Sequence, residues 1–316
     1  MKKIAFVFPG QGSQELGMLG EAAATRSSVL ETFAKASAVL GYDLWELVQT
    51  GPEEQLNQTE FTQPALLTAS IALWRLARED GVLLPHVLAG HSLGEYSALV
   101  AAEVIDFDAA VKLVQKGGQY MQSSVPLGEG GMAAVLGLDD ARVSAICIEI
   151  SQAGGPDTVV QAANYNAPGQ VVIAGKNEGL ARAIEACKAA GAKRAMALSV
   201  SAPFHSVLMR PAAERMAAEL AAVEFRAPTI DIIQNVNADF CSEPDKIREN
   251  LVQQMYSAVR WTETIQRMAI SGVDRVVECG PGKVLTGLNK RIDKSLESMS
   301  IHSLASLAET LEALSQ

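Results

Sequence analysis

The chain has 316 residues, of which 48% are hydrophobic and 5% aromatic, and its formal net charge is -10 at pH 7. This length is enough for one large domain, or for a large domain with a smaller one inserted, around a sizeable core. The acidic balance argues against a nucleic-acid partner, because binding phosphates takes clustered lysine and arginine residues.

Cysteine usage and apolar runs bear on the compartment. The four cysteines include no C-x-x-C pair, so the sequence predicts neither a disulfide framework nor a thiolate metal site. The first apolar run, residues 4–8, stops at Pro9 and is shorter than a secretory signal requires. No stretch approaches the roughly 18 continuous apolar residues of a membrane span. We therefore expect a cytoplasmic protein with no membrane partner.

Short apolar runs alternate with amphipathic stretches, a pattern typical of α/β proteins. In the first part of the chain we expect a strand at 4–8, a helix from 18 to about 41, a helix at 63–79, a strand at 87–89 and a helix at 93–102.

From about Gly131 the pattern of apolar and amphipathic stretches changes. The sequence then predicts a strand at 132–136, a helix at 139–153, strands at 158–164 and 170–174, a helix at 178–190 and an extended segment at 194–200. This β-α-β-β-α-β order is that of the ferredoxin-like split unit. We expect residues 126–200 to form a small domain inserted into a larger one made of residues 1–125 and 201–316, in which residues 276–278 supply a late core strand.

Residues 90–94 read GHSLG and match the pattern G-x-S-x-G. Small residues on both sides permit a strained turn from strand to helix that exposes the serine hydroxyl, and a strand and a helix are expected on either side here. We interpret Ser92 as a nucleophile, with the backbone N–H of Leu93 able to donate to the negative charge that develops beside it. The alternative is an ordinary helix N-cap serine.

A nucleophilic serine needs a base, and the chain has only four histidines, His86, His91, His205 and His302. His91 adjoins the serine, but neighbouring side chains on a turn diverge. His205 lies in a loop with Pro203 where the chain returns from the inserted domain, which makes it the candidate base. The alternative is a histidine with no catalytic role.

Two glycine-rich segments fail as nucleotide-binding motifs. Glu15 stands where the dinucleotide fingerprint needs glycine or alanine, and Val277 and Val284 break the P-loop pattern around Gly282 and Lys283. No H-E-x-x-H or equivalent ligand spacing supports metal catalysis, and no metal site is predicted.

Four motifs together carry a family likeness: FPGQGSQ at 8–14, GHSLGEY at 90–96, NAPGQVV at 166–172 and ECGPGKVL at 278–285. In this order, and over essentially the whole chain, they resemble the malonyl-CoA:acyl carrier protein transacylases of bacterial type II fatty acid synthesis. The resemblance implies an α/β-hydrolase-like large domain interrupted by a ferredoxin-like one, with the active site between them.

The resemblance also implies roles for individual residues. Ser92 would carry the acyl group, His205 would be its base, and Gln254 would orient the histidine with a carbonyl rather than a carboxylate. The backbone amides of Gln11 and Leu93 would form the oxyanion hole. Substrate binding would fall to Gln63, Gly117 and Asn166.

One position departs from the family pattern. The family has an arginine in an R-G-x-x-M-Q segment that pairs with the malonyl carboxylate, whereas residues 117–122 here read GGQYMQ. Glycine offers no planar fork for a carboxylate. The neighbouring Lys116 points about 100° away around a helix. We therefore expect acyl transfer with weakened malonyl selectivity, and a transferase that prefers uncharged acyl groups is the alternative.

The implied partners are malonyl-CoA or another acyl-CoA, and an acidic acyl carrier protein; no permanently bound cofactor is expected, the CoA thioester being a substrate. The densest late group of basic residues is Lys283, Lys290, Arg291 and Lys294, which we expect to contact the carrier or the CoA phosphates. A solvated helix face is the alternative. The competing functions are a serine thioesterase, which would admit water to the acyl-serine, and a catalytically silent carrier-binding module.

Overall fold

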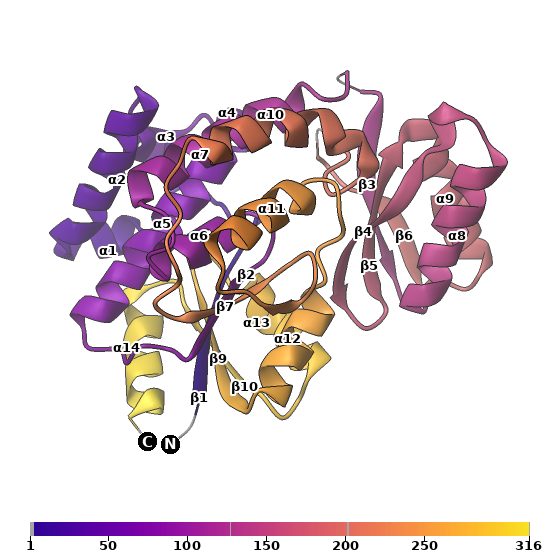
Figure 1. Cartoon of the computed structure of the whole chain (residues 1–316). Helices are drawn as coiled ribbons and strands as arrows, with labels where there is room; N and C mark the ends of the chain where they lie inside the picture. The colour runs from indigo at the N-terminus through magenta and orange to yellow at the C-terminus, as the bar shows by residue number, and fades with distance from the viewer. Residues whose placement is uncertain (1–2, 127, 201, 316) are drawn as a thin grey trace.

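The computed structural model describes residues 3–126, 128–200 and 202–315 (Figure 1). Strand β1 (Lys3–Phe8) lies at the centre of the larger sheet and is buried from its second residue onward. Phe6 and Phe8 face Trp74 of helix α5 (Thr59–Glu79), with ring centroids 5.4 and 6.2 Å apart. Alternate side chains of a strand point to opposite faces, so the residues between them pack against a second layer of helices.

The larger sheet has six strands in the order β10-β9-β1-β2-β7-β8. All neighbouring pairs are parallel except β7 with β8. The strands besides β1 are β2 (Val87–Gly90), β7 (Asp231–Gln234), β8 (Asp239–Phe240), β9 (Val273–Cys279) and β10 (Glu297–Ile301). The carboxyl ends of its parallel strands therefore meet at one edge, where ligands bind in sheets of this kind.

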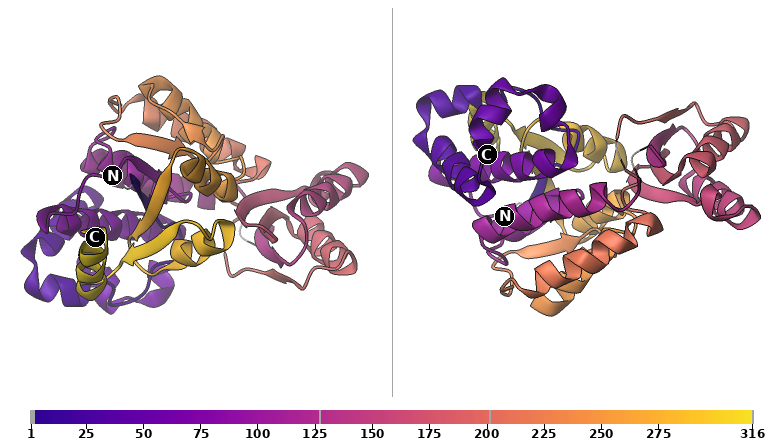
Figure 2. Two further views of the ribbon diagram at one scale, coloured as in Figure 1. Left: turned by 90° about the horizontal axis from the view of Figure 1, so that it is seen from below. Right: turned by 90° about the horizontal axis from the view of Figure 1, so that it is seen from above.

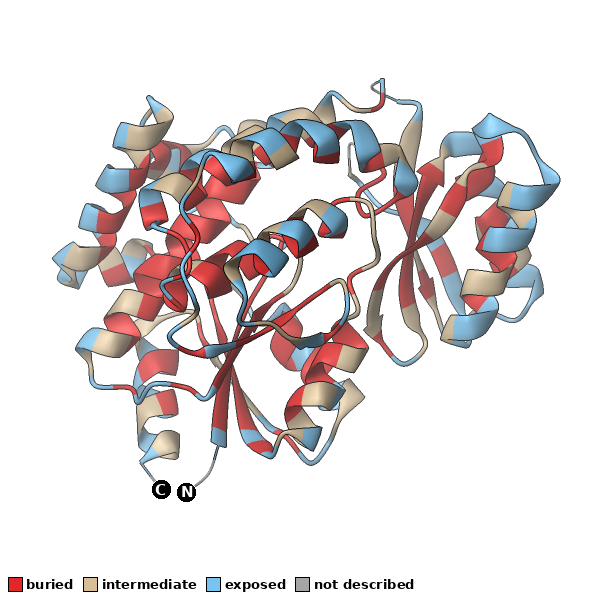
Figure 3. Cartoon of the chain, viewed as in Figure 1, coloured by how far each residue is buried: buried red, intermediate tan, exposed pale blue. Residues whose placement is uncertain are grey.

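Helices cover both faces of this sheet (Figures 1 and 3). Besides α5 they are α1 (Gly20–Thr25), α2 (Ser27–Leu40), α3 (Leu44–Thr50), α4 (Glu53–Leu56), α6 (Gly94–Ala101), α7 (Phe107–Gln122), α10 (Arg210–Ala221), α11 (Pro244–Gln254), α12 (Trp261–Ile270), α13 (Val284–Ile292) and α14 (Leu304–Leu314). A 3-10 turn, Val207–Met209, leads into α10.

A second, antiparallel sheet of four strands lies at one end of the molecule, as both views in Figure 2 show. Its order is β4-β5-β3-β6, with β3 (Gly130–Leu136), β4 (Val160–Ala167), β5 (Gln170–Lys176) and β6 (Arg194–Ala197). Helices α8 (Asp140–Ala153) and α9 (Asn177–Ala189) pack on one face of it through a separate apolar cluster. The other face contributes Met132, Val172 and Ala174 to the main core, so this sheet is packed directly against the rest of the protein.

The structure corrects three predicted elements. The expected helix from 18 to 41 is two helices, because Arg26 is extended, with φ -130° and ψ 101°, and its side chain pairs with Asp80 beyond the end of α5. The strand expected from 158 begins at Val160, since residues 156–158 form a 3-10 turn. The extended segment from 194 remains in the sheet only to Ala197. In the described part of the chain, none of the helices has the length and apolar character needed to cross a membrane.

Candidate active site

Ser92 lies in the sharp turn between β2 and α6. Its φ is 54°, a left-handed conformation that is uncommon for a residue with a side chain. The turn is so tight that a Cβ on Gly90 would come within 1.8 Å of the Gly94 carbonyl carbon, and one on Gly94 within 2.1 Å of the Phe8 oxygen. The glycines of the G-x-S-x-G pattern are thus required by close backbone approach.

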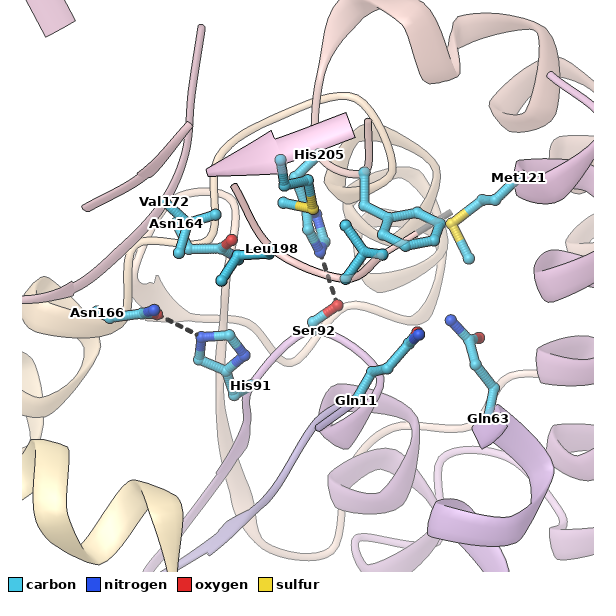
Figure 4. A pocket seen from close by; sticks show the side chains of 13 residues that line it. Gln11, Gln63, His91, Ser92, Met121, Asn164, Asn166, Val172, Leu198 and His205 are labelled. Carbon is cyan, nitrogen blue, oxygen red and sulfur yellow. Dashed lines mark hydrogen bonds between the residues drawn. The ribbon is translucent and has the colours of Figure 1, made fainter. Parts of the chain in front are cut away.

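The side chain of Ser92 meets His205, 113 residues further along the chain, with 2.7 Å between Oγ and Nε2 (Figure 4). On its other side, His205 Nδ1 lies 3.0 Å from the backbone oxygen of Gln254. A carbonyl can only accept, so Nδ1 carries the proton and the lone pair of Nε2 faces the serine hydroxyl. Ser92 does not act as an N-cap, since its hydroxyl is engaged by the imidazole and α6 has no side-chain cap.

The other three histidines are engaged elsewhere. His91 Nε2 bonds Asn166 Oδ1 at 2.8 Å, and the His91 ring packs edge-on against Trp261. His86 accepts from the backbone of Ile4, and His302 bonds Ser300. Within the described residues His205 is therefore the histidine that contacts Ser92.

The environment of His205 favours its neutral form. The side chain is buried, and burial lowers the pKa of the imidazole to about 4. The hydrogen bond to the Gln254 carbonyl raises the pKa and offsets part of this effect. At neutral pH the imidazole is therefore uncharged and able to accept the proton of Ser92.

The side chain of Asn235, a residue that was not predicted to be functional, hydrogen-bonds the backbone of the turn that carries Ser92. Its Oδ1 accepts from the backbone N–H of Ser92 at 2.7 Å, and its Nδ2 donates to the Gly90 oxygen at 2.6 Å. The backbone N–H of Asn235 in turn donates to Glu95, a buried carboxyl whose pKa is raised to about 7 by burial. No sequence motif marks Asn235, because these bonds span 140 to 145 residues.

Leu93 directly follows Ser92 in the turn, and Gln11, in the loop after β1, lines the same cavity as Ser92. Neither backbone amide has a hydrogen-bond partner among the described residues. The N–H of Ser92 itself is taken by Asn235. Two backbone donors are thereby left unpaired, among described residues, in the lining around Ser92.

The motif at residues 278–285 packs against the loop of the motif at residues 8–14. Glu278, at the end of β9, is fully buried and accepts from the amides of Leu285 and Thr286 in the first turn of α13. After it, Gly280 passes so close that a Cβ would come within 2.5 Å of the Pro9 ring. The segment of residues 278–285 therefore packs against the loop that presents Gln11.

A cavity of about 220 Å³ opens over Ser92 between the two sheets. Figure 4 shows Gln11 and Gln63 pointing into it from one side and Asn164 and Val172 lying on the other. Gln63 is buried, and its side-chain amide has no hydrogen-bond partner among the described residues. Asn166 also lines the cavity, and its Oδ1 is hydrogen-bonded to His91.

A narrower recess of about 30 Å³ continues from Ser92 past Gly117. Its walls are mostly apolar, and Met216 lies 3.8 Å from where a Cβ on Gly117 would be. Lys116 does not replace the expected arginine, because α7 is regular and the ammonium pairs with Glu219 at 2.6 Å. Among the residues described, no lysine or arginine lines either cavity.

The late basic residues lie on and around α13, all of them exposed: Lys283, Lys290, Arg291 and Lys294. Arg291 hydrogen-bonds Gln170 of the smaller sheet. Gly282, just before Lys283, approaches Ser13 of the loop that carries Gln11. The group thus lies near the join between the two sheets. The described residues contain no group of three or more histidine, cysteine, aspartate or glutamate side chains arranged to hold a metal ion.

Comparison with known proteins places this site in a class. Residues 5–311 match the family model described as the acyl transferase domain, so the chain is an acyltransferase. It is 53% identical to the malonyl CoA-acyl carrier protein transacylase of Escherichia coli K12, over 99% of this chain and 100% of that protein. It is 42% identical to the enzyme of that name from Bacillus subtilis, over 100% of this chain and 98% of the other.

Comparison with solved structures gives the same relationship. A crystal structure of an acyl carrier protein S-malonyltransferase from Vibrio cholerae superposes with a TM-score of 0.94 at 54% identity, covering 98% of this chain and 99% of that one. A malonyl-transacylase solved with a type II polyketide acyl carrier protein gives a TM-score of 0.95 at 51% identity, with coverage of 98% and 99%. The chain belongs to the family of malonyl CoA-acyl carrier protein transacylases.

Proposed function

We propose that this chain transfers the malonyl group of malonyl-CoA to the phosphopantetheine thiol of acyl carrier protein through an acyl-enzyme on Ser92. The observation that carries the proposal is the 2.7 Å contact between Ser92 Oγ and His205 Nε2 at the floor of the cavity. The family relationship supports the choice of acyl group and acceptor, since relatives covering the full chain carry this activity in their names.

The chemistry proceeds in two half-reactions. His205 Nε2 takes the hydroxyl proton as Ser92 Oγ attacks the thioester carbonyl, and the thiolate of CoA leaves with that proton as free thiol. The carrier thiol then gives its proton to His205 and attacks the acyl-serine; the bond to Ser92 Oγ breaks, and His205 returns the proton to that oxygen. The Gln254 carbonyl stabilises the imidazolium that forms in each step.

We assign the oxyanion hole to the backbone amides of Gln11 and Leu93. Both lack a partner in the described structure, and the start of α6 adds the favourable end of a helix dipole. Each donor of such a pair typically stabilises the transition state by about 3 to 4 kcal/mol.

The malonyl carboxylate needs a donor that is not a guanidinium, because position 117 is glycine. We propose the side-chain amide of Gln63, which lines both the cavity and the recess and is otherwise unpaired among described residues. A neutral amide holds a carboxylate less strongly than an arginine fork does. Malonyl selectivity is therefore expected to be weaker than that of a site with the arginine.

We further propose the domain organisation expected from the sequence, with an α/β-hydrolase-like part made of residues 1–125 and 201–316 and a ferredoxin-like part made of residues 126–200. The strand order β4-β5-β3-β6 and its antiparallel pairing support the second assignment. Ser201, at the second boundary, lies outside the described residues.

The carrier surface is proposed to include Lys283, Lys290 and Arg291, near the join between the two sheets, whose positive charge complements an acidic partner. No permanently bound cofactor enters the scheme, in which the CoA thioester is a substrate. The cytoplasmic location stays a prediction, consistent with four free cysteines. The competing thioesterase and silent-module functions are not favoured by the family relationship.

The test is a transfer assay that reads the mass of the carrier protein. Wild-type protein with malonyl-CoA should add one malonyl group to holo-carrier, while Ser92→Ala should not. An apo-carrier without the phosphopantetheine thiol is the control for the acceptor. Release of free malonate without carrier malonylation would show a thioesterase instead.

A further inference from the structure

His205, like Ser92, has a left-handed backbone, with φ 56°. A histidine in this conformation is strained unless the surrounding structure holds it. The residue follows the Ala202–Pro203 segment by which the chain returns from the smaller sheet, and Ser206 after it is extended. Within the turn, the Ser206 hydroxyl donates to the Pro203 oxygen at 2.6 Å, and the backbone on the C-terminal side of His205 is bonded from outside the turn.

One side chain bonds the backbone of this turn at the strained residue and again two residues after it. Gln161, on β4 of the smaller sheet, donates through Nε2 to the backbone oxygen of His205 at 3.2 Å. Its Oε1 accepts from the backbone N–H of Val207 at 2.9 Å. Because the carbonyl can only accept and the N–H can only donate, the orientation of the Gln161 amide is fixed by its partners.

The arrangement repeats what Asn235 does for the serine turn. There too a side-chain amide bonds backbone groups at and beside the left-handed residue, Ser92 N–H and Gly90 oxygen. The difference is the origin of the amide. Asn235 follows β7 of the larger sheet, whereas Gln161 comes from the smaller one.

We propose that Gln161 is a positioning residue that fixes the His205 turn to the smaller sheet and so sets the alignment of the imidazole with Ser92. The proposal rests on the proposed function, since it concerns the acylation step. Gln161 does not line either cavity and has no contact with the position of the acyl group. Its loss should therefore lower the rate of acylation without weakening the binding of the donor.

The experiment measures single-turnover acylation of Ser92 by malonyl-CoA in Gln161→Ala, Gln161→Glu and wild type. Misplacing a reacting group by about 1 Å costs up to about a hundredfold in rate, so we expect the saturating rate of Gln161→Ala to fall about ten- to a hundredfold. The donor concentration at half-saturation should change less than about twofold. Gln161→Glu keeps the acceptor for the Val207 N–H and should retain an intermediate rate.

Gln152→Ala is the matched control, an exposed glutamine of α8, which packs on the face of the smaller sheet opposite to the His205 turn. Thermal unfolding and the final yield of acyl-enzyme establish the folded, active fraction of each variant, and rates are compared per active site. A wild-type rate in Gln161→Ala, or a loss confined to half-saturation, overturns the inference. If Gln161→Ala does not fold, Gln161→Glu decides: a wild-type saturating rate overturns the inference and a reduced one supports it. Absence of acyl-enzyme in wild type would instead refute the proposed function.

Discussion

The backbone N–H of Ser92 donates to Asn235 Oδ1 at 2.7 Å. This N–H is therefore not available to donate to a substrate oxygen. The same contact holds the nucleophile turn to the end of β7. It explains how a non-glycine residue keeps a φ of 54° at this point.

Replacing Asn235 by alanine should both destabilise the protein and slow acylation. The Gly90 oxygen and the Ser92 N–H would lose their partner in a buried place, which costs about 1 to 3 kcal/mol for each unsatisfied group. Urea unfolding and the acylation rate of Asn235→Ala would measure the two effects. Asn237→Ala, at an exposed position two residues later, is the control; if both variants behave alike, the role assigned to Asn235 is wrong.

The pH dependence of acylation should reflect the buried His205. Only the neutral imidazole accepts a proton, and burial lowers its pKa to about 4 from the ordinary 6.5. The rate constant kcat/KM should thus be flat across neutral pH and fall as the pH drops through about 4. The measurement uses an uncharged reagent that reacts with Ser92, because the malonyl carboxylate of the natural donor would itself titrate at low pH. A half-point at 6.5 would contradict the buried, neutral base.

Introducing an arginine at position 117 should raise malonyl selectivity. A Cβ at Gly117 has only van der Waals contact with Met216, so a side chain can start there without a clash. We expect the ratio of malonyl to acetyl acylation rates to rise at least about tenfold in Gly117→Arg, from a charge-assisted pair with the carboxylate. Gly117→Met supplies bulk without charge. An unchanged ratio in Gly117→Arg would show that this recess does not receive the carboxylate.

Reversing the charge of the basic group should weaken carrier recognition. We expect Lys290→Glu with Arg291→Glu to raise the KM for carrier several-fold at low salt, an effect that added salt should diminish by screening. The KM for malonyl-CoA reports whether the CoA phosphates bind there as well. Lys188→Glu on α9, another exposed lysine, is the control. An unchanged carrier KM at low salt would remove these residues from the docking surface.

The parts of the site that sequence could predict are those written into short, contiguous patterns. The G-x-S-x-G turn requires its glycines because the backbones of β2, α6 and β1 nearly touch, and the pattern therefore marks Ser92 directly. His205 could be proposed because only four histidines exist and one lies in a loop at the return to the main body. The resemblance supplied Gln254, whose backbone carbonyl, rather than its side chain, reaches the imidazole.

The supporting amides escaped prediction for a physical reason. Asn235 and Gln161 act through side-chain bonds to backbone groups that are 143 and 44 residues away in sequence. Polar residues at strand ends are common, and neither residue has a charge or a spacing that signals chemistry. The break between α1 and α2 was missed likewise, because the extended residue there is Arg26 and no proline or glycine marks the break.

The central claim is that Ser92 itself carries the acyl group, and intact-mass measurement after mixing the protein with malonyl-CoA alone tests it most directly. We predict a stable gain of one malonyl group, located by peptide mapping on the segment that holds Ser92 and absent from Ser92→Ala. An unmodified wild-type mass, or a malonyl group that persists in Ser92→Ala, would contradict the account.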